Sequence, residues 1–266
     1  MFPAMDTQPV SVGEQVRHWR LRRRLSQLDL ACEAEISTRH LSFIETGRAS
    51  PSREMILHLA ESLDVPLRQR NNLLLAAGYA PIYQDRSLDD PALRPAREAI
   101  DALLAAHEPF PALAVDRHWA LIAANTAVSP LMAGAAPELL KPPVNVLRLS
   151  LHPSGLAPRI ANLAEWRDHL LFRLRRQFAE TADPVLSDLL TELAAYPTGG
   201  PGPRAGDLGA IAVPLRIRAE GGVLSFLSTT MMFGTPLDPT LAEVALETFL
   251  PADAATAAAL RGASPK

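Results

Sequence analysis

Two serines that can begin helices, Ser26 and Ser37, stand eleven residues apart, and this short spacing limits the local fold more than any other feature of the sequence. Ser26 precedes Asp29 by three residues, the arrangement of a capping box. Ser37 is suited to cap a second helix. Two helices of about eight residues, joined by a tight link at Glu35 and Ile36, form a helix-turn-helix.

The second helix of such a motif enters the major groove of DNA, where its early exposed residues meet the edges of bases. The residues with the spacing of a buried face are Ile36, Leu41 and Ile44. Thr38 and Arg39 face the other way, and an arginine can form two hydrogen bonds with guanine. Phe43 follows one turn later, where it either contacts a thymine methyl group or packs in the core. The sequence therefore predicts a DNA-reading helix.

This region resembles the XRE, or phage-repressor, type of five-helix DNA-binding domain. The matching stretches are 26–31, 36–48 and 51–52, and the resemblance covers residues 10–80. Carried over position by position, it implies a DNA-facing set of Gln27, Ser37, Thr38, Arg39, Phe43 and Arg48. Gln27 and Arg48 would contact phosphates, and Arg20 would form a structural salt bridge with Glu45. The sequence departs from the family pattern at Glu35, where glycine is common. The departure bears on the geometry of the turn, because a non-glycine residue at positive φ is disfavoured.

Charge alone does not indicate a nucleic-acid partner, because the formal net charge of the chain is -3. Cations are nevertheless concentrated before the motif, with no acid between Glu14 and Asp29. The clustered residues are Arg17, Arg20, Arg22, Arg23 and Arg24. Apart from the structural role implied for Arg20, this cluster either contacts phosphates or forms a solvated helix face.

The boundary of the helical region is marked by Gly78 and Pro81, since glycine tolerates the left-handed cap of a helix and proline cannot continue one. A polar, acidic stretch follows. We therefore expect a DNA-binding domain over residues 10–81, a linker over 82–92 and a second domain over 93–260.

The second domain mixes helical and strand patterns. An amphipathic helix is expected to end near His107, and apolar runs at 111–115 and 119–123 flank a short turn, which predicts a β-hairpin. Two helices follow at 163–178 and 184–193, the second with Asp183 at its N-cap.

Further strands are predicted at 211–217, where Pro214 indicates an edge or a bulge, and at 223–233. A last helix is predicted from Asp238 through Phe249. An antiparallel sheet with helices against it, an α+β fold, is the expected result.

Four segments, 151–158, 162–167, 233–238 and 249–253, resemble the ligand-binding domain of MmyB-like transcription regulators. The resemblance spans residues 93–260. It implies a PAS-like fold beside an XRE-type DNA-binding domain, with a hydrophobic cavity in which a fatty acid has been found in at least one member.

Cavities for small molecules are mostly apolar with a few polar anchors. The candidate lining residues are Phe110, Trp119, Met132, Phe172, Phe226, Met231, Met232 and Phe233. For each of them, ordinary core packing is the alternative. An acyl ligand would need a partner for its carboxylate, because a buried unpaired charge is costly. Arg117, Arg148 and Arg173 are candidates, and no spacing selects among them.

Signals of an enzyme, a metal site or a cofactor site are absent. The histidines never fall at metal-ligand spacing, and the glycine-rich loop at 199–206 lacks the Lys-Ser/Thr of a phosphate-binding loop. The single cysteine, Cys32, excludes an internal disulfide. No apolar run reaches the length of about 18 residues that a membrane span needs.

We therefore expect a cytoplasmic, non-enzymatic, sequence-specific regulator of transcription that binds double-stranded operator DNA as a homodimer. Its C-terminal domain is expected to bind a small apolar effector such as a fatty acid. The alternative is a C-terminal domain that serves as a ligand-free dimerisation or protein-interaction module. A continuous internal cavity favours the first hypothesis and a close-packed interior favours the second.

Overall fold

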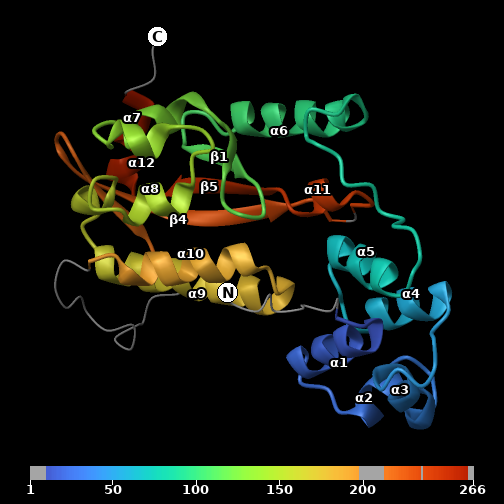
Figure 1. Ribbon diagram of the computed structural model, residues 1–266. Coiled ribbons are helices and arrows are strands. Elements are labelled where there is room, and N and C mark those ends of the chain that lie inside the picture. Colours follow the sequence, from blue (N-terminus) through green and yellow to red (C-terminus); the bar gives the residue numbers. More distant parts are fainter. Residues whose placement is uncertain (1–9, 198–212, 235, 263–266) are drawn as a thin grey trace, which may run out of the picture. The chain divides into compact units, whose positions relative to one another are not determined.

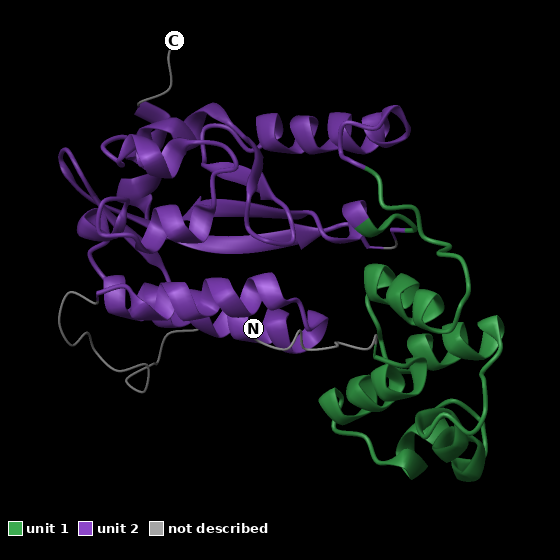
Figure 2. Ribbon diagram, in the orientation of Figure 1, with its two compact units in different colours: residues 1–86, 237–239 green, residues 87–236, 240–266 purple. Residues whose placement is uncertain are grey.

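The computed structural model describes residues 10–197, 213–234 and 236–262. The chain divides into two compact units (Figure 2). Unit 1 consists of residues 1–86 and 237–239, and unit 2 of residues 87–236 and 240–266. The first division falls after Arg86, within the stretch of polar sequence that separates the two patterns.

Unit 1 is helical. Its helices are α1 (Val12–Arg22), α2 (Gln27–Glu33), α3 (Thr38–Glu45), α4 (Arg53–Ser62) and α5 (Leu67–Ala76) (Figure 1). The first four begin at serines whose side chains accept a hydrogen bond from a backbone N–H of the first turn, which satisfies a group that the helix itself leaves unpaired. The predicted five-helix domain is confirmed, including the capping box of Ser26 and Asp29.

Unit 2 contains a five-stranded sheet. Its strands are β1 (Ala112–Val115), β2 (Leu121–Ala124), β3 (Leu215–Ala219), β4 (Gly222–Met232) and β5 (Ala245–Pro251). The strand order is β2-β1-β5-β4-β3, and every neighbouring pair is antiparallel. The predicted hairpin of β1 and β2 is present, and the α+β fold is confirmed.

The α-helices that follow are α6 (Arg94–Ala106), α7 (Ser129–Met132), α8 (Val146–Leu151), α9 (Leu163–Thr181), α10 (Pro184–Ala195), α11 (Pro239–Ala242) and α12 (Ala254–Gly262). They belong to unit 2, except for Pro239 at the start of α11. Short 3-10 helices lie at Pro91–Leu93, Thr126–Val128, Pro137–Leu140 and Ala157–Arg159. As predicted, Asp183 caps α10 and Pro184 is its first residue. None of the helices in the described part of the chain combines the length and the apolar character needed to cross a membrane.

The two faces of the sheet carry separate cores. Helices α9 and α10 run along one face (Figure 1), where Leu174, Leu189 and Phe226 belong to the larger core. Helix α6 covers part of the other face, and its Ile100 and Leu104 belong to a smaller core. Burial of apolar side chains on both faces holds the sheet between helices.

The last predicted helix is the main error of the sequence prediction. Helix α11 ends at Ala242, and the residues from Ala245 onward form β5, the central strand of the sheet. Pairing with both β1 and β4 outweighed a short apolar run whose spacing also fits a helix. A helix that was not predicted, α12, follows this strand.

The strand predicted at 211–217 begins later than expected. Strand β3 starts at Leu215, so Pro214 precedes the strand, while Ile211 lies outside the described residues. Proline lacks the N–H that a sheet ladder requires, which explains why pairing starts after it. The predicted edge position is confirmed, because β3 is the terminal strand beside β4.

Candidate DNA-binding surface and ligand cavity

Helix α3, which the sequence predicts to read DNA, is held in place by the carboxylate of Glu45. Arg20 of α1 donates to it from Nε at 2.6 Å and from Nη2 at 3.0 Å, and Gln27 of α2 donates from Nε2 at 2.7 Å. The side chains of the ion pair are only 8% and 2% exposed. The hydrogen bonds that Arg20 donates to the Glu45 carboxylate raise the pKa of its guanidinium. One carboxylate thus joins α1 to the two helices of the motif, α2 and α3.

The exposed side of α3 carries the residues predicted to read DNA. Thr38 and Arg39 are exposed, and Ser37 caps the helix by accepting from the His40 N–H at 3.1 Å. Phe43 is half-buried, and the guanidinium carbons of Arg39 and Arg48 lie 5.3 and 5.9 Å from the centre of its ring. Such cation–π contacts favour this placement of the two charges. The surface therefore presents two cations beside an apolar ring.

Of the predicted DNA-facing set, Gln27 takes a second role that the sequence did not indicate. Its side-chain amide donates a hydrogen bond to Glu45, which orients the start of α2 against the end of α3. Its contact with phosphate stays a prediction, as do the base contacts of Thr38, Arg39 and Phe43.

The turn between α2 and α3 places its glutamate in a conformation that favours glycine. Glu35 has φ +50°, a left-handed conformation, and the Ile36 N–H donates to Ala31 at 2.9 Å to close the turn. For a residue with a Cβ atom, this conformation is higher in free energy than the right-handed one by about 1–2 kcal/mol.

We therefore expect Glu35→Gly to raise the free energy of unfolding of unit 1 by up to about 1 kcal/mol, because relief of the left-handed strain exceeds the added flexibility of the unfolded chain. Urea denaturation followed by circular dichroism measures the change. Glu33→Gly, at an exposed helical position in α2, is the matched control and is expected to lower stability. Equal shifts in the two variants would contradict the assigned strain.

Unit 2 contains an apolar cavity on the sheet face that carries α9. Its walls come from β1, β2, β3, β5, α7, α8 and α9 together with neighbouring segments. About 80 Å³ is open to the centres of water-sized molecules, and a single water needs only about 10–15 Å³ by this measure. Ser150, Arg173 and Glu247 are the polar side chains of a wall otherwise formed by aliphatic side chains, a proline and aromatic rings.

Two of the predicted lining residues, Trp119 and Met132, lie at this cavity. The others do not, and their positions explain why. Phe172 points outward from α9 and is 57% exposed, and Met231 and Met232 are also exposed. Phe226 is fully buried but packs edge-on against Phe249, which takes the place at the wall.

The remaining two predicted residues belong elsewhere in unit 2. Phe233 packs against the smaller core on the opposite face of the sheet, and Phe110 lies edge-on to His107. Sequence analysis missed the aliphatic wall and Trp166. The helical spacing of Trp166 and Leu170 on α9 was the signal that could have placed them, because both fall on one face of that helix.

Trp119 is held at the cavity in a strained conformation. Its φ is +66°, which is rare for a bulky residue. Asp116 accepts hydrogen bonds from the N–H groups of His118 and Ala120, both at 2.8 Å, which fixes the turn around it. Strain of this kind persists only where surrounding contacts impose it, and it gathers at functional sites.

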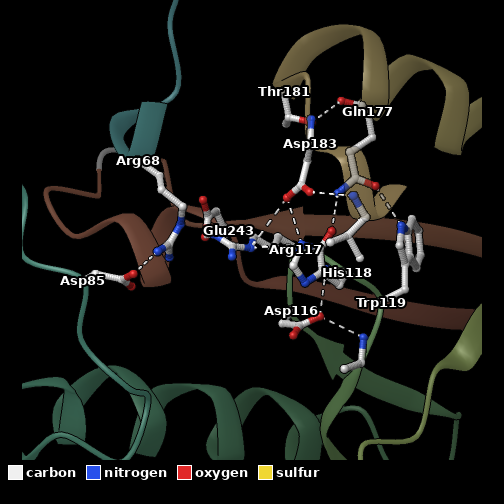
Figure 3. A network of polar contacts seen from close by, with 12 residues as sticks. Arg68, Asp85, Asp116, Arg117, His118, Trp119, Gln177, Thr181, Asp183 and Glu243 are labelled. Carbon is white, nitrogen blue, oxygen red and sulfur yellow. Dashed lines mark hydrogen bonds and ion pairs between the residues drawn. The ribbon is translucent and has the colours of Figure 1, made fainter. Parts of the chain in front are cut away.

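Polar contacts from α9 and α10 hold the same turn (Figure 3). Gln177 accepts from the Trp119 indole N–H and donates to the Arg117 carbonyl oxygen, both at 2.7 Å. His118 lies 2.8 Å from Asp183, and Arg117 lies 3.4 Å from Glu243. The turn is thus tied to α9, which forms part of the cavity wall, and to Asp183 at the N-cap of α10.

The three arginines proposed as carboxylate partners occupy different places. Arg117 belongs to the polar network and Arg148 pairs with Glu192 at 2.7 Å, and neither lines the cavity. Arg173 lines it, with its guanidinium 5.0 Å from the centre of the Trp119 ring. Within the described ranges, no group of three or more His, Cys, Asp and Glu side chains is arranged to hold a metal ion.

Comparison with known families agrees with both units. Residues 11–73 match a family described as a helix-turn-helix domain, and residues 96–263 match the MmyB-like transcription regulator ligand binding domain. A search among curated proteins found no match. A helix-turn-helix domain joined to a ligand-binding domain defines a transcription regulator. Because the second match covers more than half of the sequence, the chain belongs to the family of MmyB-like transcription regulators.

Proposed function

We propose that this regulator binds double-stranded operator DNA in a sequence-specific manner through α3, as a homodimer, and that a small apolar effector in the cavity of unit 2 controls this binding. The observation that carries the proposal is the exposed Arg39 and Arg48 beside Phe43 on the helix that a buried ion pair fixes in place. Phosphate contacts would set affinity, and Arg39 would supply base readout.

Replacement of Arg39 by alanine tests the DNA-binding part. We expect Arg39→Ala to fold normally and to lose about 10- to 100-fold in preference for operator over scrambled duplex, because a bidentate contact with guanine contributes about 1–3 kcal/mol of discrimination. Gel-shift titration measures the preference, on an operator found by selection from random duplexes. Half-site spacing in the selected sequences also reports the oligomeric state.

Arg94→Ala is the matched control, because Arg94 is an exposed arginine of unit 2 that pairs with Glu98 in the next turn of α6. It is expected to keep the wild-type preference. If Arg39→Ala kept the wild-type preference for operator over scrambled duplex, the assignment of α3 as the DNA-reading helix would be wrong.

The effector part of the proposal is supported by the cavity and by its apolar wall. An acyl chain fits such a wall, and a fatty acid is the ligand that the family resemblance implies. The volume of the cavity accommodates a short acyl chain. A long acyl chain would require the walls of the cavity to separate. A cavity of this kind favours a sensor over a ligand-free interaction module, and we propose no enzymatic role for it.

We expect organic extraction of the purified protein to release an acyl compound, and added medium-chain acyl compounds to raise its melting temperature, because a ligand that binds only the folded state stabilises it. Mass spectrometry of the extract and a thermal-shift assay measure the two effects. A clean extract together with no thermal shift would favour the interaction module instead.

A further inference from the structure

The polar end of the cavity holds a closed ion pair. Arg173 of α9 donates to Glu247 of β5 from Nη1 at 3.0 Å and from Nη2 at 2.6 Å. Glu247 is 3% exposed, and Thr230 of β4, which pairs with it across the sheet, donates to its Oε1 at 2.9 Å. These are the two ionisable side chains among the described residues that line the cavity, so its wall is neutral overall.

We propose that the cavity selects an uncharged compound with an aliphatic chain, such as an alcohol, an ester or an amide, and that Glu247 sets this selectivity by occupying Arg173. The proposal rests on the proposed function and names the chemical class of its effector. Glu247 is a specificity-determining residue in this scheme, because it supplies from the protein the carboxylate that a fatty acid would otherwise bring.

The charge balance carries the argument. A ligand carboxylate would enter beside Glu247 and would share Arg173 with a carboxylate that the chain already holds in place. Two like charges at one cation repel each other, and an uncompensated charge is costly beside an apolar wall. The Arg173 side chain is 23% exposed, so solvent reduces this cost without removing it.

A second potential cation near the pair does not change the balance. His169 lies one turn before Arg173 on α9 and stacks on Trp166 at 5.4 Å between ring centres. Burial and the neighbouring Arg173 charge lower the pKa of this imidazole, while the nearby Glu247 and Glu165 oppose the shift. The ring is therefore neutral at pH 7 and provides no extra charge for a carboxylate.

Two side chains that line the cavity, Arg173 and Ser150, retain donors for a neutral head group. No hydrogen-bond partner of Arg173 Nε is found within the described part of the chain, so this N–H is available to an oxygen acceptor. The Ser150 hydroxyl accepts from the Trp166 indole N–H at 3.1 Å and keeps its own hydrogen to donate. A carbonyl or hydroxyl oxygen can take such hydrogen bonds without adding charge.

The test compares decanoate, decanol and decanamide on the full-length protein, stripped of bound lipid, by thermal shift and by calorimetric titration. We expect wild type to bind decanamide and decanol at least about tenfold more tightly than decanoate, the difference that one charge-dependent interaction supplies. Glu247→Gln frees Arg173 and is expected to reverse this order. Comparison of each variant with wild type cancels the differences in water solubility among the three compounds.

Glu192→Gln is the matched control, since it removes the carboxylate partner of Arg148, which does not line the cavity. It is expected to keep the wild-type order. Decanoate binding as tightly as decanamide on wild type would overturn the inference while leaving the proposed function in place, and this comparison decides the matter even if Glu247→Gln fails to fold. An unchanged order in a folded Glu247→Gln would overturn it as well. Absence of binding by all three compounds would overturn both proposals.

Discussion

Glu45→Ala is expected to lower the free energy of unfolding of unit 1 by about 3–5 kcal/mol, because it leaves the buried guanidinium of Arg20 without its partner. The Gln27 amide loses its acceptor in the same substitution. Among the described residues, Arg20 then keeps its hydrogen bond to the Leu25 carbonyl oxygen, at 2.8 Å. A loss of this size is a large fraction of the stability of a small helical domain.

Hydrogen exchange resolved over the peptides of α1, α2 and α3 measures this change where it occurs, separately from unit 2. The double variant Arg20→Met/Glu45→Leu is the control, because it removes both charges and fills their space with apolar atoms. It is expected to recover most of the loss. A double variant as unstable as the single one would show that the unpaired charge is not the cause.

The helical unit could be predicted from sequence because its signals are local. The capping box of Ser26 and Asp29 and the glycine cap at Gly78 each act over a few residues, and the structure contains both features, with Gly78 at φ +82°. The link between Gln27 and Glu45 could not be predicted in this way. It depends on how three helices pack, which spacing along one helix does not report.

Strand β5 shows where local signals fail. The segment from Leu241 to Phe249 has apolar residues at spacings that fit a helix, but the sheet needs a central strand between β1 and β4. Its residues Leu246, Glu247 and Thr248 are all buried. Burial on both sides removes the alternation that marks a strand, so this pattern is ambiguous from sequence alone.

Sequence analysis predicted part of the cavity wall. The rest could not be predicted, because apolar character does not reveal which face of a strand a residue occupies. Along β4, the polar Thr230 contacts Glu247 and Arg173 at the cavity side, while the apolar Leu227 and Met231 are exposed. Successive side chains of a strand point to opposite faces, so a shift of one position exchanges the two sets. Here Thr230 faces the cavity side of the sheet, where it supports the ion pair of Arg173 and Glu247.

Gly13 in α1 is a position where helix propensity and packing make opposite predictions. Alanine is favoured over glycine within a helix by up to about 1 kcal/mol. A Cβ atom on Gly13, however, would lie 2.2 Å from the carbonyl oxygen of Ile44 and 3.0 Å from that of Glu45. These are backbone atoms of α3, which cannot rotate away as a side chain can, so one of the two helices must move.

We expect packing to prevail, and Gly13→Ala to lower the free energy of unfolding of unit 1 by about 2–3 kcal/mol and to weaken operator binding, because the displaced helix is the one that carries Arg39. Urea denaturation and gel-shift titration measure the two effects. Gly262→Ala, at the end of α12 with no atom near its added Cβ, is the matched control and is expected to be neutral or slightly stabilising. Greater stability in Gly13→Ala would mean that α1 and α3 do not approach as closely as described.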